Sequence, residues 1–410
     1  MDKLKNYLLS DTFLVFSDQA IFSGTNFVLT LLFAQKLSIA AFGLFSSIVL
    51  LGYLSMSITN ALVIQPFQVH ISKEFHKKQY YIWMLCFLIA LLIVIINIGF
   101  VLQFVFKKQI LIQSIIWPSV VYIIGLLFQD FFRKLLLGIR QLKENLLIDV
   151  FFLILVAAYF VINMQSLNLK MILFTIGIAN VLSSLPGIIF ICTNYEFPNQ
   201  WKRFNNLHFH QGKWLLMVAV LQWLSSNFFV LVSGIYLGIE SLGALRLVQS
   251  FFGLLNIALQ TVENFYLPKV AHLYQQNRQK ATFFLKQKTA YAGIFFAIIL
   301  TVLIVFASKI ITLAGGVAYQ QYAYVVQIMA ILYVFIFISY PVRIAVRVLV
   351  LNKIFFIGYV LSFVSSLLFF HFLLKNYLLY GAVIGLIINQ IVMILYWQSQ
   401  LIKHQFKLWK

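Results

Sequence analysis

Long apolar runs, each about as long as a bilayer is thick, follow one another along almost the whole chain. A helix needs about 20 apolar residues to cross the hydrocarbon core, and about twelve runs meet this requirement. They lie near residues 12–34, 42–64, 81–103, 110–129, 146–163, 171–192, 214–238, 242–262, 289–307, 322–343, 354–374 and 377–397. The runs are continuously apolar and do not alternate, which favours helices over strands. The pattern predicts an all-α, polytopic membrane protein with about 12 transmembrane helices.

A short segment after the first run recurs about 200 residues later. Leu37-Ser-Ile-Ala-Ala-Phe-Gly43 is similar to Leu237-Gly-Ile-Glu-Ser-Leu-Gly243, and each copy separates two apolar runs. Duplicated sets of membrane spans are typical of transporters, whose substrate site lies between the two repeats. We therefore expect two pseudo-symmetric six-helix bundles, residues 1–200 and 201–410.

The composition and the charge distribution agree with this membrane topology. Hydrophobic residues make up 62% of the chain and charged residues 10%, against about 25% charge in a soluble protein. The net charge is +20. Of the 30 Lys and Arg residues, 23 lie in alternate segments between the runs, and only 6 lie in the other segments. Because cytoplasmic loops collect positive charge, this bias predicts cytoplasmic termini and explains the basic excess without nucleic acid as a partner.

The eighth run carries a stripe of polar residues. Six positions separated by three or four residues share one helix face: Arg246, Gln249, Gly253, Asn256, Gln260 and Glu263. At 1.5 Å per residue the stripe is roughly 26 Å long, close to the hydrocarbon thickness. Such a face either lines a wet cavity or forms a hydrogen-bonded seam against another helix. A cavity lining would make Arg246, Gln249, Asn256 and Gln260 substrate-binding residues.

The first half carries a milder version of this stripe. Subtracting 200 maps Gly253 onto Tyr53 and Gln260 onto Asn60. The first run adds Asn26 on a polar face of its own. We expect Tyr53, Asn60 and Asn26 to contribute to the same substrate site from the other repeat.

Two acidic residues are candidates for coupling transport to H⁺ or Na⁺. Asp18 lies about two turns inside the first run, where a carboxylate can take up a proton or hold a cation; it can equally be an interfacial acid. Glu263 closes the polar stripe. Glu263 and Asp149 lie nearer to the ends of their runs, which favours side chains that reach the headgroup layer.

Basic residues cluster where the fourth and tenth runs end. Arg133 and Lys134 follow the fourth run, and Arg343 and Arg347 close the tenth, so that Arg133 and Arg343 correspond at an offset of 210. Basic clusters next to a span can capture an anionic headgroup at the inner leaflet. Simple topology determinants explain the same cluster.

The sequence gives no positive support for catalysis or for a metal site. His208 and His210 form a two-histidine pair, too few ligands for zinc. A Gly-rich phosphate loop, a Gly-x-Ser-x-Gly motif and a water-exposed pair of carboxylates are all missing. We expect no enzymatic activity, no metal and no cofactor, with H⁺ or Na⁺ as the coupling ion.

The repeat resembles the polysaccharide transporter family, the Wzx-type O-antigen flippases of the MOP superfamily, which also contains lipid II flippases and MATE exporters. The resemblance rests on the segments Leu37–Gly43 and Leu237–Gly243 and on Pro66 and Pro268, which close the following segments. Span count and two-fold layout extend it over nearly the whole chain.

The resemblance implies two six-helix bundles in a V shape that alternate between inward-open and outward-open states. It implies a polyprenyl-diphosphate-linked oligosaccharide, an O-antigen, capsule or exopolysaccharide repeat unit, as the substrate, and a bacterial inner membrane as the location. Arg246 matches the cavity cations that hold the diphosphate in related flippases. Partners would be membrane lipids and the polymerase and glycosyltransferases of polysaccharide biosynthesis. A MATE-like, cation-coupled exporter of small molecules is the alternative.

Overall fold

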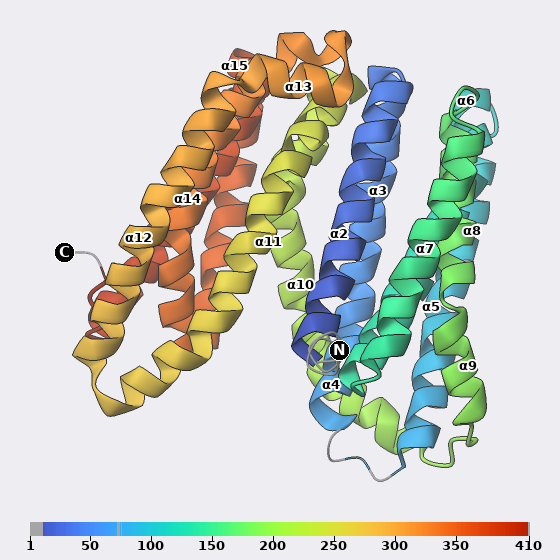
Figure 1. The fold of residues 1–410 in the computed structure, drawn as a ribbon, viewed down its shortest axis with the longest axis horizontal. Coiled ribbons are helices and arrows are strands. Elements are labelled where there is room, and N and C mark those ends of the chain that lie inside the picture. The colour runs from blue at the N-terminus through green and yellow to red at the C-terminus, as the bar shows by residue number, and fades with distance from the viewer. Residues whose placement is uncertain (1–10, 72–73, 75, 409–410) are drawn as a thin grey trace, which may run out of the picture. The chain divides into compact units, whose positions relative to one another are not determined.

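A computed structural model describes residues 11–71, 74 and 76–408, and almost all of these residues are helical (Figure 1). In chain order the elements are α2 (Asp11–Lys36), α3 (Ile39–Thr59), the π-helix η1 (Asn60–Ile64), α4 (Gln65–His70), α5 (Lys77–Val105), α6 (Ile110–Gly138), α7 (Leu142–Ile162), α8 (Leu169–Ser183), α9 (Leu185–Thr193), α10 (Trp201–Leu237), α11 (Ile239–Gln276), α12 (Arg278–Val305), α13 (Ala307–Gly315), the 3₁₀ helix η3 (Val317–Tyr322), α14 (Ala323–Val348) and α15 (Asn352–Lys403). The described part of the chain is thus all-α, as predicted.

Ten helices in the described part of the chain are long and apolar enough to cross a membrane. In α12 only 11% of the most apolar stretch is buried inside the protein, and in α5 only 17%. Apolar surface of this extent would aggregate in water. These surfaces fit contact with lipid, and the chain is a multi-pass membrane protein.

Eleven of the twelve predicted runs lie on these ten helices, to within two residues at the run ends. The helix α15 has 52 residues, roughly twice what one crossing requires, and it contains a break at Leu378 with φ 49° and ψ −129°. The break separates the eleventh and twelfth runs. The first run coincides with α2, a helix outside the group of ten because its polar residues lower its mean hydropathy.

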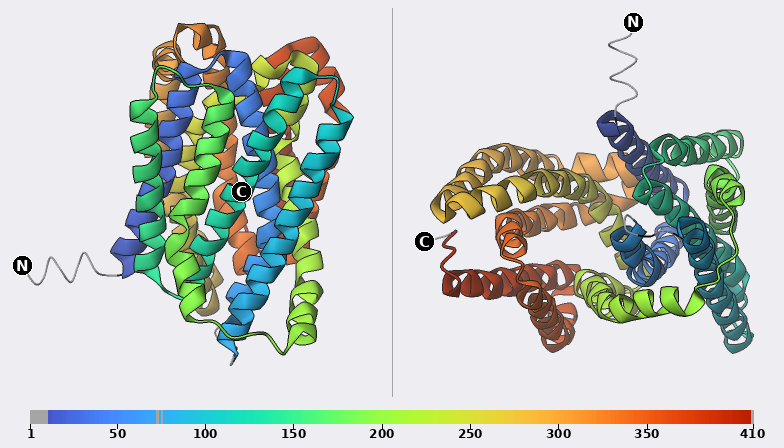
Figure 2. Two further views of the ribbon diagram at one scale, coloured as in Figure 1. Left: turned by 90° about the vertical axis from the view of Figure 1, so that its right-hand side faces the viewer. Right: turned by 90° about the horizontal axis from the view of Figure 1, so that it is seen from below.

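The helices form two compact units. Unit 1 contains residues 11–29 and 47–220, and unit 2 contains residues 30–46 and 221–408. The long helices within each unit run side by side (Figure 2). Helices α2, α3 and α10 each begin in one unit and end in the other. These units rest on contacts, whereas the halves 1–200 and 201–410 rest on the sequence repeat and stay a prediction.

Aromatic packing fixes the start of α10 within unit 1. His208 is 1% exposed, and its Nδ1 lies 2.8 Å from the carbonyl oxygen of Leu62. Because that oxygen can only accept, Nδ1 carries the proton and Nε2 accepts from the hydroxyl of Tyr80 at 2.6 Å. Phe204 stacks on the Tyr80 ring with centroids 4.8 Å apart. Thus α5, η1 and α10 share one core.

A buried polar network joins α10 to both segments of α15 in unit 2. The hydroxyls of Ser225 and Ser362 lie 2.7 Å apart. Ser365 and Ser366 both donate to Oδ1 of Asn389, whose amide nitrogen donates to the carbonyl of Ser225 at 3.3 Å. Serine and asparagine between transmembrane helices act as polar contacts that hold helices together.

The two copies of the sequence repeat meet each other in unit 2. A Cβ on Gly43 of α3 would collide with the carbonyl of Ile239, and a Cβ on Gly243 of α11 would lie 3.0 Å from the Cα of Gly43. It would also lie 3.1 Å from the carbonyl of Ile39. Each glycine therefore faces the isoleucine at the start of the opposite helix. Glycine is required at both positions because the two backbones touch.

Candidate functional sites

The polar stripe on α11 combines open and bonded positions. Arg246 is half-buried, and its Nη1 donates to Oε1 of Gln249 at 3.0 Å. Asn256 donates to the hydroxyl of Tyr333 on α14 at 2.7 Å. At Gly253 a Cβ would meet no other heavy atom within 4 Å, and Gln260 is exposed. The stripe is hydrogen-bonded to α14 at two positions, Asn256 and Glu263, and is open at Gly253 and Gln260.

The residues of the predicted counterpart lie in unit 1, on α2, α3 and η1. Tyr53 on α3 is 42% exposed. Asn26 on α2 donates to the carbonyl of Phe22 in its own helix at 2.8 Å. Asn60 begins the π-helical turn η1 and accepts a hydrogen bond from Nζ of Lys134 at 2.9 Å. The π-helix η1 comes just before Pro66, whose nitrogen carries no hydrogen and cannot donate the backbone hydrogen bond of a regular α-helix.

Unit 1 contains a buried cluster of one arginine and two aspartates. Arg133 on α6 places Nη2 3.2 Å from Oδ2 of Asp18 on α2, and Nε 2.8 Å from Oδ1 of Asp149 on α7. The Phe22 ring centroid lies 3.7 Å from the guanidinium carbon. The three side chains are at most 10% exposed. We name Asp18, Arg133 and Asp149 the acidic cluster.

The acidic cluster carries one more carboxylate than guanidinium. Asp18 Oδ1 and Asp149 Oδ2 are buried and accept no hydrogen bond from any described residue. Next to Arg133, Lys134 is neutralised by its own partner, Asp130, at 2.8 Å. A buried surplus of negative charge is costly unless it gains a cation or a proton. The cluster is therefore suited to H⁺ or a monovalent cation.

Unit 2 contains a related cluster with the opposite charge balance. Glu263 on α11 is 2% exposed and faces two arginines on α14. Its Oε1 lies 2.7 Å from Nη1 of Arg347, and its Oε2 lies 3.5 Å from Nη2 of Arg343. We name these three residues the basic cluster. The expectation that Glu263 and Asp149 reach the headgroup layer is wrong, because both are buried against arginines.

Two helices continue past the ends of the predicted runs, and this explains why the clusters were not foreseen. The fourth run stops at residue 129 but α6 reaches Gly138, and α14 reaches Val348. The sequence assigned Asp18 and Arg133 to different roles, whereas they form an ion pair. A membrane helix can contain charged residues that pair with one another, so it can extend beyond the end of its apolar run.

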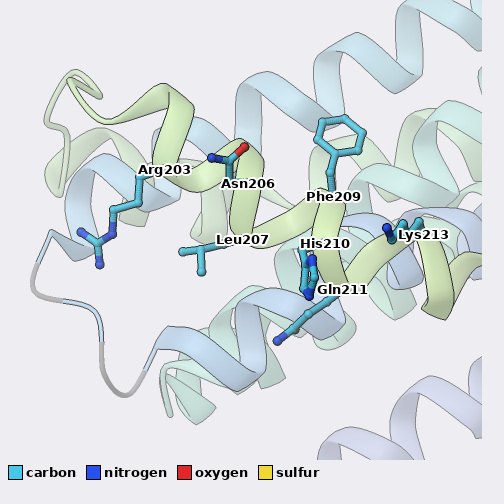
Figure 3. Close-up of a pocket in the computed structure, with 7 residues that line it drawn as sticks. All are labelled: Arg203, Asn206, Leu207, Phe209, His210, Gln211 and Lys213. Atoms are coloured by element: carbon cyan, nitrogen blue, oxygen red, sulfur yellow. The ribbon is translucent and has the colours of Figure 1, made fainter.

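A basic hollow of about 780 Å³ lies beside the start of α10 (Figure 3). Its lining consists of Arg203, Asn206, Leu207, Phe209, His210, Gln211 and Lys213. Arg203 is held by Glu74 at 2.7 Å. None of the seven side chains is acidic, so the hollow is suited to anionic groups. Across residues 11–71, 74 and 76–408, no three His, Cys, Asp or Glu side chains could together hold a metal ion.

Several solved structures of membrane transporters are similar to this chain, although no protein-family model and no curated sequence matches it. The lipid II flippase MurJ in an inward closed conformation has a TM-score of 0.72 and 13% identity, covering 95% of this chain and 87% of that one. An inward-facing multidrug resistance MATE transporter of the MOP superfamily has a TM-score of 0.63 and 12% identity, covering 97% of both. The chain has the MOP superfamily fold.

A third structure with the MOP fold comes from Pyrococcus furiosus and is described by the reverse polarity of its binding pocket. It has a TM-score of 0.56 and 12% identity, covering 96% of this chain and 92% of that one. The expected fold is thus confirmed. The narrower resemblance to Wzx-type flippases stays a prediction.

Proposed function

We propose that this protein is a flippase that moves a polyprenyl-diphosphate-linked oligosaccharide across a bacterial cytoplasmic membrane by alternating access. The polar stripe on α11 carries the proposal, because it offers a cation and amides along about the thickness of a bilayer. The similarity to a lipid II flippase supports the lipid-linked substrate class. Both termini lie in the cytoplasm according to the charge bias, and glycosyltransferases and a polymerase would supply and consume the substrate.

Arg246 is the residue that we assign to the diphosphate. Its guanidinium is half-buried and shares one hydrogen bond with Gln249. Guanidinium groups bind phosphate oxygens with two parallel hydrogen bonds. Asn256 and Gln260, with Tyr53, Asn60 and Asn26 from the other repeat, would bind sugar hydroxyls. The lipid tail would stay in the bilayer.

We assign ion coupling to the acidic cluster. Asp18 and Asp149 share one guanidinium, so that one H⁺ or Na⁺ would balance the charge. Glu263, the second coupling candidate, is already paired with two arginines and is the weaker candidate.

Substitution of Arg246 in the native organism tests the substrate assignment. We expect Arg246→Ala to abolish surface glycan while the protein level stays normal, and Arg246→Lys to restore part of it because the charge is kept. Lys309→Ala removes a positive charge at the predicted outer side and serves as the matched control. Normal glycan in Arg246→Ala would remove Arg246 from the mechanism.

A cation-coupled exporter of small molecules is the second candidate, because the acidic cluster would serve either function. Drug-sensitivity profiling of a deletion strain separates the two. Sensitivity to small compounds without any glycan defect would favour the exporter. A glycan defect without altered drug sensitivity would favour the flippase.

A further inference from the structure

Among the residues that the structure describes, the basic cluster combines two arginines with one carboxylate and so carries one surplus positive charge. Arg343 and Arg347 lie one turn apart on α14, and both face the single carboxylate of Glu263. Nε of Arg343 is buried and donates to no described residue. A surplus cation held in a membrane helix is costly unless it meets water or an anion.

No other acidic residue in this half of the sequence can balance that charge. Residues 201–410 contain seventeen Lys and Arg residues but only two acids, Glu240 and Glu263. Glu240 belongs to the first turn of α11, 23 residues before Glu263 and thus roughly 34 Å away along the helix. The missing anion must therefore come from outside this half.

The two arginines keep donors that such an anion can reach. The side chain of Arg343 is 25% exposed and that of Arg347 is 45% exposed, whereas Glu263 is 3% exposed. Each guanidinium has five N–H donors, and the carboxylate contacts one nitrogen of each. The guanidinium carbon of Arg343 lies 4.9 Å from the ring centroid of Tyr340, which limits its orientation.

We propose that Arg343 and Arg347 bind the phosphate group of a membrane lipid, and that Glu263 is an internal counter-ion that competes with it. Two guanidinium groups one helical turn apart can surround a tetrahedral phosphate with paired hydrogen bonds. The arginines lie at the end of α14 that the charge bias predicts to be cytoplasmic, where lipid phosphates are found. If the phosphate belongs to the lipid-linked substrate, this inference rests on the proposed function. If the phosphate belongs to a phospholipid, the inference is independent of the proposed function.

The proposal predicts the direction in which lipid affinity changes when Glu263 is substituted, and a purely structural ion pair would not produce that change. If the carboxylate competes with phosphate, Glu263→Gln keeps the shape and frees both arginines, so lipid binding should become tighter by about fivefold. If Glu263 only orients the arginines, its loss should weaken lipid binding or leave it unchanged.

Lipid binding to the purified full-length protein in detergent micelles, followed by microscale thermophoresis, tests the proposal. The probes are polyprenyl diphosphate, phosphatidylglycerol and polyprenol, which lacks phosphate. We expect Arg347→Gln to weaken binding of a phosphate-bearing lipid by about tenfold or more, and Arg347→Lys to weaken it less. Lys280→Gln, which removes an exposed charge on α12, is the matched control and should bind like the wild type.

Each outcome supports the proposal, overturns it, or identifies the lipid that supplies the phosphate. Phosphate-dependent binding that falls in Arg347→Gln and rises in Glu263→Gln supports the site. Loss confined to phosphatidylglycerol supports a phospholipid site and counts against polyprenyl diphosphate as its ligand, while the Arg246 experiment tests the flippase separately. Equal binding of all three probes, or unchanged binding in both folded variants, would overturn the site. Arg343→Gln provides a second loss variant if Arg347→Gln does not fold.

Discussion

Arg133 in the acidic cluster of unit 1 and Arg343 in the basic cluster of unit 2 correspond at a sequence offset of 210. The two clusters nevertheless carry opposite net charge. Arg133 on α6 faces Asp18 and Asp149, a balance of minus one, whereas Arg343 on α14 shares Glu263 with Arg347, a balance of plus one. Exposure differs as well, since Arg133 is 10% exposed and Arg347 45%. The sequence repeat predicts that Arg133 and Arg343 are equivalent, and the different residues around them give the two clusters opposite charge.

The largest expected difference between the clusters is the cost of losing the arginine. Arg133→Gln leaves two buried carboxylates unpaired and should lower the free energy of unfolding by about 3–5 kcal/mol. Arg343→Gln should cost about 1 kcal/mol or less, because Glu263 keeps Arg347 at 2.7 Å. Thermal unfolding of the purified proteins in detergent, followed by tryptophan fluorescence, measures both.

A double-mutant cycle sharpens this comparison. Asp149→Asn should recover part of the stability lost in Arg133→Gln, because it removes one of the unpaired charges. Equal losses in Arg133→Gln and Arg343→Gln, or additive effects in the cycle, would contradict the charge balance described for the acidic cluster.

A smaller effect is expected from cations. If the acidic cluster binds H⁺ or Na⁺, a saturating cation should stabilise the wild type by up to about 2.7 kcal/mol at a hundredfold excess over the dissociation constant. Asp149→Asn should lose this dependence, because one guanidinium then faces one carboxylate. Glu144→Gln, an acid in the first turn of the same helix α7, should keep it. A cation response that survives in Asp149→Asn would place the ion elsewhere.

The smallest effects concern the repeat itself, where the two halves are most alike. Gly43→Ala should destabilise the protein by about 1–2 kcal/mol, because the added methyl group meets the backbone of Ile239 and overpacking outweighs the gain in helix propensity. Gly253→Ala on the open part of α11 should instead stabilise by about 0.5–1 kcal/mol. Melting temperatures of the two variants measure the contrast, and a shift of the same sign in both would argue against the backbone contact.

The length and hydrophobicity of the apolar runs were sufficient to predict the all-α fold and the approximate positions of the long helices. Length and hydrophobicity are local properties of the sequence, so the twelve runs coincide with helical segments. The eleventh and twelfth runs both lie in α15, where the break at Leu378 separates them. The repeat also aligned Gly43 with Gly243, but only the structure shows that the backbones at these two glycines touch.

The composition of the charged clusters could not be predicted in the same way. Charged residues ended the fourth run at residue 129, because an apolar count treats Asp130 and Arg133 as loop residues. Whether a charge ends a helix depends on partners distant in the sequence, such as Asp18 for Arg133. The charge of a site is therefore a property of the tertiary contacts, and a single helix face does not reveal it.

Translocation by the purified protein in liposomes tests the central claim most directly. Vesicles would carry a polyprenyl-diphosphate-linked oligosaccharide, and an impermeant glycosidase would report the share of sugar that reaches the outer leaflet. We predict that the wild type raises this share well above that of protein-free vesicles and that Arg246→Ala, folded and inserted equally well, does not. Exposure of the sugar at the protein-free rate with wild-type protein, or at the wild-type rate with Arg246→Ala, would contradict the account.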